Sequence, residues 1–243
     1  MRTIYGRKPV LEAIKSDQQI EQINLQYGSK GSIIQEIIRE AKRRKIKVSE
    51  LGNERFKKLK GNERSQGVIA FISDLNYLAL DELVYKHHGE ANTLLLLLDS
   101  IQDPQNLGAI LRSAECTGCD GVVLTTNNSA PISETTIKTS AGAVNHLDIC
   151  KVTNLNNAID YLKSNGYWVT GTQLGGGKKY TEVDYSGKVA IVMGNEEKGI
   201  HRLVAEKCDN LVEIPMIGNI QSLNVSVATG VMLFEVLRQR NNK

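Results

Sequence analysis

The sequence feature that most constrains the fold is the run Thr93–Leu98, in which one threonine is followed by five consecutive leucines. A short, unbroken apolar run between polar segments is typical of a strand buried on both faces, such as a central strand of a parallel sheet. Further apolar runs at residues 121–125, 167–171 and 189–193 alternate with segments of helical spacing. The alternation predicts an α/β fold built on a parallel sheet.

Two segments near the C-terminus, residues 192–200 and 214–226, share one pattern. Each begins with an apolar strand end and continues into a loop of glycine and small polar residues before a helix start. Loops at the carboxyl ends of parallel strands are where α/β proteins bind ligands, so the pair predicts a binding site. Ser222 and Asn224 are expected to open the last helix, beside its free backbone N–H groups. The apolar residues expected to recur at helical spacing here are Leu223, Val227, Val231 and Phe234.

A third polar segment, residues 103–108, follows the leucine run. Asp103 precedes a proline, which favours an extended or turn conformation at that position. We expect Asn106 to cap the helix that follows. Arg112 lies beside the apolar stripe of that helix and, taken alone, is typical of a solvated helix charge.

The net charge of +3 is unevenly distributed, because residues 1–74 carry a net +7 and the remainder a net −4. A basic segment joined to an acidic one indicates a polyanion partner for the first. The basic run at 42–47 fits a solvated helix end equally well, but a second basic set favours a phosphate-binding face. This set comprises Arg55, Lys57, Lys58, Lys60 and Arg64. We therefore divide the chain into a basic module at 1–74, a linker at 75–90 and a second module at 91–243.

Cysteine usage argues against a metal centre or a redox pair. Cys116 and Cys119 have the CxxC spacing, but no second Cys or His pair completes a four-coordinate zinc site. We interpret both as small residues buried around a helix end. The N-terminus has no apolar signal core, and the leucine run is too short to span a bilayer. We therefore expect a cytoplasmic protein with no metal and no membrane partner.

Three blocks thus follow one another along the chain, at residues 103–112, 193–199 and 214–226. In this order and at these separations they resemble the three motifs of the SpoU (SPOUT-class) RNA ribose 2′-O-methyltransferases. The N-terminal segments 5–14 and 65–69 are similar to the substrate-binding domain of the subgroup that methylates a guanosine of 23S rRNA. The resemblance covers nearly the whole chain.

The resemblance implies a parallel α/β SPOUT domain at 91–243, whose C-terminal chain forms a deep trefoil knot, an exception to the rule that chains are not knotted. It implies a small ribosomal-protein-like RNA-binding domain at 1–74, a homodimer, and S-adenosylmethionine as the cofactor. Cofactor contacts are implied for Gly194, Ile214 and Leu223, and more weakly for Thr172, Gly199 and Met216. Catalytic or substrate-contacting positions are implied for Asn106, Arg112, Glu196, Ser222 and Asn224.

By the same resemblance, the expected reaction moves a methyl group to a ribose 2′-hydroxyl, with a guanosine of 23S rRNA as the first expectation. The family proposal makes Arg112 the general base. The alternative is that Arg112 grips a phosphate and stabilises the developing alkoxide, because arginine is normally never deprotonated. A tRNA ribose methyltransferase and a non-catalytic RNA-binding assembly factor are the rival functions. A dinucleotide oxidoreductase is disfavoured, since neither module has the glycine fingerprint after its first strand.

Overall fold

The computed structural model describes residues 2–16, 19–72, 75–195, 199–220 and 222–241. The chain divides into two compact units, a smaller one of Met1–Asn76 with Pro131–Ser133 and a larger one of Tyr77–Ala130 with Glu134–Lys243. Of the linker predicted at 75–90, residues 77–90 belong to the larger unit. They include helix α4 (Leu80–Lys86), whose Leu83 and Val84 side chains are buried in the core of that unit.

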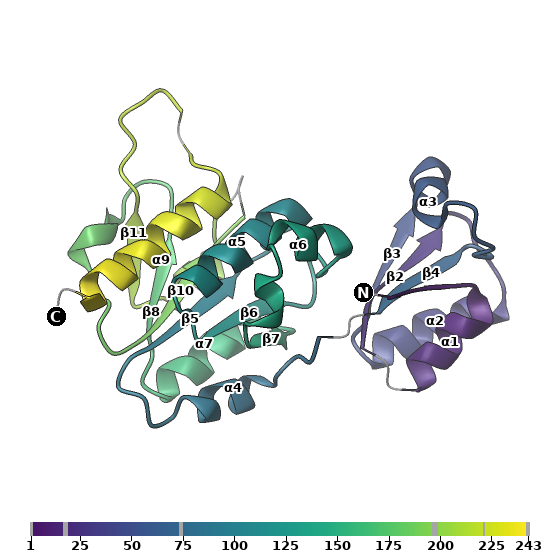
Figure 1. Ribbon diagram of the computed structural model, residues 1–243, viewed down its shortest axis with the longest axis horizontal. Helices are drawn as coiled ribbons and strands as arrows, with labels where there is room; N and C mark the ends of the chain where they lie inside the picture. Colours follow the sequence, from purple (N-terminus) through teal and green to yellow (C-terminus); the bar gives the residue numbers. More distant parts are fainter. Residues whose placement is uncertain (1, 17–18, 73–74, 196–198, 221, 242–243) are drawn as a thin grey trace. The chain divides into compact units, whose positions relative to one another are not determined.

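The smaller unit is a four-stranded sheet with helices packed on it (Figure 1). Its elements are β1 (Arg2–Tyr5), α1 (Arg7–Lys15), β2 (Ile20–Gln26), α2 (Ser32–Arg43), β3 (Lys47–Leu51), α3 (Asn53–Lys60) and β4 (Val68–Ile72). The strand order is β1-β4-β2-β3, with β2 and β3 parallel and β4 antiparallel to both of its neighbours. Helices α1 and α2 pack together and bury Ile14 and Ile37 in a common core with Ile23 of the sheet.

The larger unit carries the leucine run as β5 (Thr93–Leu98). Besides α4 and β5, its helices and strands are α5 (Pro104–Cys116), β6 (Gly121–Thr125), α6 (Glu134–Thr139), β7 (Ile149–Val152), α7 (Leu155–Ser164), β8 (Trp168–Thr172), β9 (Lys178–Lys179), β10 (Lys188–Met193), α8 (Arg202–Ala205), β11 (Asn210–Glu213) and α9 (Val225–Asn241). Two short 3-10 turns, Ala143–Asn145 and Tyr180–Glu182, complete the regular structure of the described residues in this unit.

The seven strands of the larger sheet lie in the order β7-β6-β5-β10-β8-β11-β9, and each pair of neighbours is parallel. The predicted parallel α/β architecture is therefore confirmed. The chain runs outward from β5 through β6 to β7, returns to β8, and later inserts β10 between β5 and β8. The carboxyl ends of β5, β8 and β10 thus meet where the strand order reverses, which is the usual ligand-binding position in open α/β sheets.

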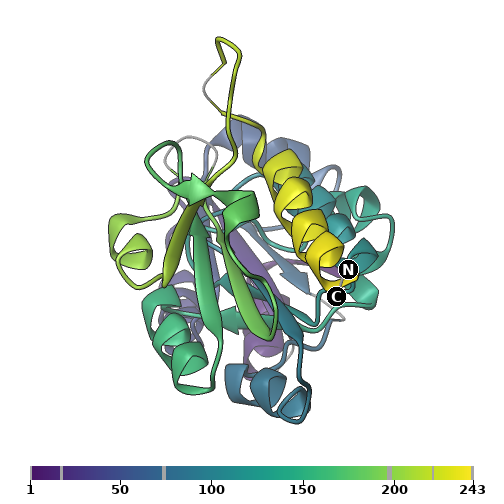
Figure 2. The same cartoon turned by 90° about the vertical axis from the view of Figure 1, so that its left-hand side faces the viewer.

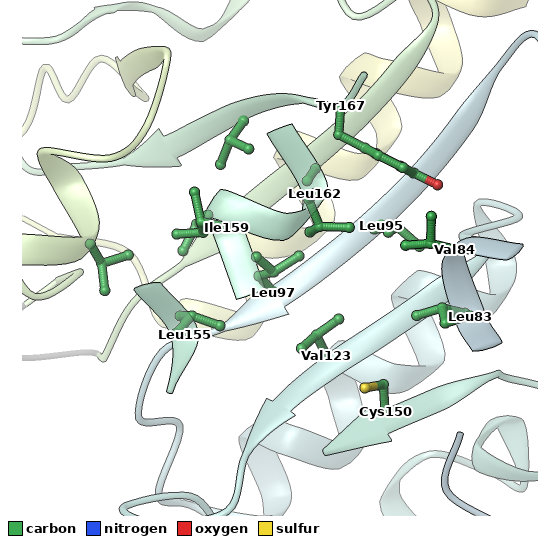
Figure 3. Close-up of a cluster of buried hydrophobic side chains, with 14 of the residues drawn as sticks. Leu83, Val84, Leu95, Leu97, Val123, Cys150, Leu155, Ile159, Leu162 and Tyr167 are labelled. Carbon is green, nitrogen blue, oxygen red and sulfur yellow. The ribbon is translucent and has the colours of Figure 1, made fainter. Parts of the chain in front are cut away.

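Helices cover both faces of this sheet (Figure 2). On one face, α4, α7 and α8 contribute to a buried apolar cluster in which Leu95 and Leu97 lie with Ile159 of α7 (Figure 3). Because successive side chains of a strand point to opposite faces, the other leucines of β5 point toward the face covered by α5, α6 and α9. All five leucines are at most 2% exposed, as expected for a strand covered on both sides.

The start of α5 differs from the prediction. Asp103, and not Asn106, caps this helix, because its Oδ1 accepts the backbone N–H groups of Gln105 at 2.6 Å and Asn106 at 2.9 Å. Pro104 takes the first helical position, where a missing N–H costs nothing. Asn106 lies in the first turn, so its side chain is available for another role.

The apolar face predicted for the last helix is also wrong. Val227 and Phe234 are each 53% exposed. The buried positions of α9, which packs on α5, are Val225, Thr229, Met232, Leu233, Glu235 and Val236. No helix among the described residues combines the length and apolar character needed to cross a membrane.

Candidate active site

A cavity of about 500 Å³ opens at the carboxyl edge of the larger sheet. Its lining comes from the segments after β8, β10 and β11 and from the first turn of α9. These lining residues are 172–175, 193–195, Gly199, 213–216, Gly218, Ile220, Ser222, Leu223, Val225 and Ala228. Figures 1 and 2 show the segment between β11 and α9 projecting from the body of the larger unit. The cavity thus lies at the position that the strand order predicts.

The loop after β10 forms one wall of the cavity and depends on a glycine. Asn195 and Gly199 exchange two backbone hydrogen bonds, of 3.0 Å from the Asn195 N–H and 2.9 Å from the Gly199 N–H. A Cβ at Gly194 would lie 2.0 Å from the carbonyl carbon of Gly199. Only glycine therefore allows the two backbone segments to meet, and the wall presents peptide groups.

Asp99 and Ser100 hold this loop to the end of β5. Asp99 is 4% exposed, and its carboxylate accepts hydrogen bonds from the backbone N–H and the Nδ1–H of His201, both at 2.8 Å. The carbonyl of Ser100 accepts a hydrogen bond from Asn195 Nδ2 at 3.2 Å. Ser100 has a φ of +64°, and a non-glycine residue in this region carries a conformational cost. The two residues therefore fix both ends of the loop.

Sequence reasoning missed this support. One sequence feature could have indicated it. Asp99 and Ser100 are polar and directly follow a strand that is buried on both faces, at the carboxyl end where parallel sheets bind ligands. His201 lies 102 residues further along the chain, so no local pattern links it to Asp99.

The first turn of α9 brings the first and third sequence blocks together. Asn224 caps the helix, since its Oδ1 accepts the backbone N–H of Ser226 at 2.9 Å. Its Nδ2 donates to Asn106 Oδ1 at 3.0 Å, across 118 residues of sequence. Leu223 and Val225, on either side of Asn224, line the cavity. The Asn106–Asn224 pair therefore lies beside the cavity and holds the Asn106 amide in a fixed orientation.

The third wall of the cavity follows β8. The Thr172 hydroxyl donates to the carbonyl of Val192 at 3.2 Å, so it is directed into the sheet. The backbone N–H of Gly177 donates to Glu213 Oε2 at 3.2 Å, which ties the loop after β8 to the end of β11. The backbone and apolar atoms of this wall are therefore better placed than the Thr172 hydroxyl to contact a ligand.

The structure gathers most of the residues that the sequence indicated. Every residue implied as a cofactor contact lines the cavity, namely Thr172, Gly194, Gly199, Ile214, Met216 and Leu223, and Ser222 does so too. Asn106 and Asn224 contact each other beside it. Arg112 is exposed on α5 and does not line the cavity, and its side chain has no hydrogen bond or ion pair among the described residues. Glu196 lies outside the described residues.

Three of the four cysteine side chains are unsuited to act as thiolate nucleophiles. Burial raises the pKa of the thiols of Cys119, Cys150 and Cys208 to about 12, so they stay protonated at neutral pH. Cys116 is exposed, so the interpretation of both CxxC residues as buried is wrong for this one.

Among the residues that the structure describes, one group of possible metal ligands forms, from His87, Glu90 and Asp120, with one ligand atom of each within 4.8 Å of the others. His87 Nδ1 already contacts Glu90 Oε1 at 3.1 Å, and Asp120 accepts the Leu94 N–H at 2.6 Å. These local partners account for the cluster.

Comparison with known proteins assigns both units to one family. Residues 93–234 match the SpoU rRNA Methylase family, and residues 3–78 match the domain described as RNA 2′-O ribose methyltransferase substrate binding. A Staphylococcus aureus (strain COL) protein named as a TrmH family tRNA/rRNA methyltransferase is 41% identical over 241 residues, which cover 98% of this chain and 96% of the relative.

Solved structures give the same result. The AdoMet-bound rRNA methyltransferase from Sinorhizobium meliloti has a TM-score of 0.63 and 27% identity, covering 97% of this chain and 86% of that one. The TrmH/SpoU tRNA modifying enzyme of A. aeolicus has a TM-score of 0.58 and 30% identity, but covers only 68% of this chain and 86% of its own.

Proposed function

We propose, from the premise that this chain belongs to the SpoU family of RNA methylases, that it methylates the ribose 2′-hydroxyl of a guanosine in 23S rRNA. Membership rests on the family match over residues 93–234 and on 41% identity to the S. aureus (strain COL) relative across 98% of the chain. At the coarser level, the chain is an RNA 2′-O-methyltransferase that acts on tRNA or rRNA. The observation that carries the proposal is the convergence of separated sequence blocks on one glycine-walled cavity, with the Asn106–Asn224 pair beside it.

The methyl donor is S-adenosylmethionine, and the cavity residues suit it. A volume of about 500 Å³ falls within the roughly 300–1,000 Å³ of small-molecule sites. Ile214, Met216 and Leu223 supply apolar surface for a purine ring, and the close backbone approach at Gly194 leaves peptide donors and acceptors for polar edges. When bound, this cofactor supplies a methyl group on a positively charged sulfur, which is already a strong electrophile.

The remaining task of the protein is to align the ribose hydroxyl and to remove its proton. Alignment of reacting groups lowers a barrier by about 7–11 kcal/mol in favourable cases. We propose that the side chains of Asn106, Ser222 and Asn224 form hydrogen bonds with the ribose and with the cofactor. The hydrogen bond between Asn106 and Asn224 prepares this alignment before substrate arrives.

We propose that Arg112 binds a phosphate group of the RNA. Its guanidinium is exposed and has no partner among the described residues, so its charge is available to an anion. It then stabilises the negative charge that develops on the ribose 2′-oxygen during methyl transfer, while the hydroxyl proton passes to water. The rival role, general base, requires a neutral guanidine, and an arginine side chain is normally never deprotonated in proteins. Glu196 is proposed to position Arg112 or the target nucleotide.

We also propose a homodimer and the trefoil knot of the family. Val227 and Phe234 give α9 an exposed apolar face that a second copy would cover. Arg112 lies outside the cavity of its own chain, so a site near a subunit interface would allow two protomers to complete it together.

The ribosomal target is favoured over tRNA by the N-terminal unit. The net charge of +7 on residues 1–74 suits a polyanion. The rRNA methyltransferase structure matches 97% of the chain, whereas the tRNA-modifying one matches 68%. A tRNA target is the second candidate function, since the latter relative is the more identical of the two at 30%.

Mapping of ribose methylation in rRNA and tRNA, from cells with and without this protein, tests the proposal. We expect one 23S rRNA guanosine to lose its 2′-O-methyl group. In vitro, Arg112→Ala should abolish transfer while S-adenosylmethionine binding is retained, and Arg112→Lys should keep charge but lose the bidentate grip. Full transfer by Arg112→Ala would remove this residue from the mechanism. Loss of methylation from tRNA alone would select the second candidate.

A further inference from the structure

Two N-terminal sequence segments that are 59 residues apart meet in the smaller unit. Arg7 Nε donates to the carbonyl of Gln66 at 3.0 Å, and Arg7 Nη1 donates to the carbonyl of Lys30 at 3.0 Å. The Arg7 guanidinium therefore joins two turns through backbone carbonyls. No carboxylate among the described residues pairs with it, so its positive charge is not neutralised.

The turn at Gln66 is held in an unfavourable backbone conformation. Gln66 has a φ of +50° and Gly67 a φ of +79°. A Cβ at Gly67 would lie 2.4 Å from Ser29 Oγ, so this turn packs too tightly for a side chain. A non-glycine residue in the left-handed region carries a cost, and such residues cluster at functional sites. We take this outlier as the first indication that the turn has a role beyond folding.

A hollow of about 750 Å³ lies against this turn and the end of α3. Arg7, Lys60 and Arg64 line it with three positive charges, against one carboxylate from Glu63. Lys60 Nζ donates only to backbone carbonyls, at 3.3 Å each. The Arg64 side chain has no partner in the part of the chain that the structure describes. The hollow is therefore an open, positively charged surface whose cations are available.

The rest of the lining is neutral and polar. Amide side chains come from Gln26, Asn62 and Gln66, and hydroxyls from Ser29 and Ser65. Amides offer both donors and acceptors, as base edges require, whereas phosphate uses only donors. No aromatic side chain lines the hollow, so the lining suits hydrogen bonding to a base edge and not stacking on its face.

We propose that this hollow binds one unstacked nucleotide of the RNA substrate, with its phosphate at Lys60 and Arg64 and its base edge at the amides. The inference rests on the proposed function in that RNA is the substrate. Sequence-specific recognition of RNA commonly targets unstacked bases in loops and bulges, whose edges are accessible. The hollow is thus a recognition site in the smaller unit, supported by Arg7 and by the turn at Gln66.

The first test measures how salt affects RNA binding by the full-length protein. The probes are a fluorescein-labelled single-stranded RNA of mixed sequence and a 23S rRNA transcript. For Lys60→Ala/Arg64→Ala, the slope of log affinity against log salt should become shallower by about 0.7, since the loss of one phosphate contact on a single strand removes about 0.7 from the slope. The control Lys15→Ala/Arg39→Ala removes the same charge from exposed positions outside the hollow. A matching slope change in both double variants overturns the proposal.

The second test separates base recognition from phosphate binding. Gln66→Gly suits the left-handed backbone and removes the amide, whose Oε1 accepts the Arg7 N–H at 3.4 Å. Relief of backbone strain and the higher entropy of the unfolded chain oppose each other, so the protein should unfold within a few degrees of the wild-type temperature. We expect weaker RNA binding with an unchanged salt slope, and unchanged binding of inorganic polyphosphate. Equal weakening for RNA and polyphosphate, or no weakening for RNA, refutes the assignment of the base.

Failure of this inference is distinguishable from failure of the proposed function. If the wild type methylates no RNA while Lys60→Ala/Arg64→Ala loses RNA binding as expected, the hollow is an RNA site and the proposed function is wrong. If methylation occurs and this variant binds RNA like the control, only the hollow is wrong. S-adenosylmethionine affinity, measured by calorimetry, should be the same in all these variants.

Discussion

Removal of the Asp99 carboxylate should weaken both the fold and the cofactor cavity. In Asp99→Ala, the backbone N–H and the Nδ1–H of His201 lose a shared acceptor at 2.8 Å. A hydrogen bond to a charged group contributes about 1.5–3 kcal/mol, and an unsatisfied buried donor costs about 1–3 kcal/mol. Because Asp99 is 4% exposed, water replaces the acceptor poorly. We expect the free energy of unfolding to fall by about 3 kcal/mol, or roughly 6–12 °C in Tm.

The same change should reach the cavity through the loop after β10. Asp99 and Ser100 fix both ends of this loop, and Gly194 and Gly199 within it line the cavity. If about half of the lost free energy must be spent on ordering the loop when the cofactor binds, S-adenosylmethionine binds about tenfold more weakly, since 1.4 kcal/mol corresponds to a factor of ten in affinity. Thermal unfolding and isothermal calorimetry measure the two effects in the same protein.

Two further variants show whether the backbone or the ring of His201 carries the effect. His201→Ala removes a ring that is 58% exposed and should cost at most about 1 kcal/mol. Asp160→Ala removes an exposed carboxylate paired with Lys207 and should stay within about 0.5 kcal/mol of wild type. The reasoning is refuted if Asp99→Ala matches the Asp160 control, or if His201→Ala costs as much as Asp99→Ala.

Three further outcomes follow from the geometry. Gly194→Ala places a Cβ 2.0 Å from the Gly199 carbonyl carbon, so the wall of the cavity must shift. Because overpacking of this kind costs about 1–3 kcal/mol, calorimetry should show that S-adenosylmethionine binds about 10–100-fold more weakly. Phe234→Glu should convert a dimer to monomer in sedimentation, whereas Leu203→Glu, equally exposed on α8, should not. A hydrogen bond from Arg238 lowers the pKa of Glu235, so its contribution to stability is present above its unfolded pKa of about 4.3 and is lost as pH falls through the folded pKa. Relative to Glu235→Gln, the wild type should therefore lose its stability advantage on acidification, and equal acid unfolding would contradict this assignment.

Local sequence signals predicted individual elements well because their causes are local. The leucine run is β5, and the apolar runs predicted at 121–125, 167–171 and 189–193 correspond to β6, β8 and β10. In each case the decisive interactions lie within a few residues. The failed cap at Asn106 has the same origin, since Asp103 competes for the same N–H groups and precedes a proline. From the sequence, Asp103 is expected only to favour a turn, and Asn106 is the predicted cap.

Strand order and the support of the site were not predictable in this way. Insertion of β10 between β5 and β8 depends on pairings across the whole unit, and every apolar run in the sequence is compatible with several neighbours. The Asp99–His201 contact spans 102 residues. The family resemblance supplied the lining residues but not their supports, because the motifs that carry it end at the residues nearest the ligand.

The last helix shows why an apolar pattern does not by itself identify a buried face. Val227, Val231 and Phe234 recur at helical spacing, and so do Val225, Thr229, Met232 and Val236, displaced by two positions. Two positions correspond to about 200° around a helix with 3.6 residues per turn, so the two stripes lie on opposite sides. The second stripe is buried within the chain, and the first is exposed at Val227 and Phe234. A helix that is apolar on both sides needs two packing surfaces, and one chain supplies only one of them. The exposed stripe is therefore the surface that the proposed homodimer would cover.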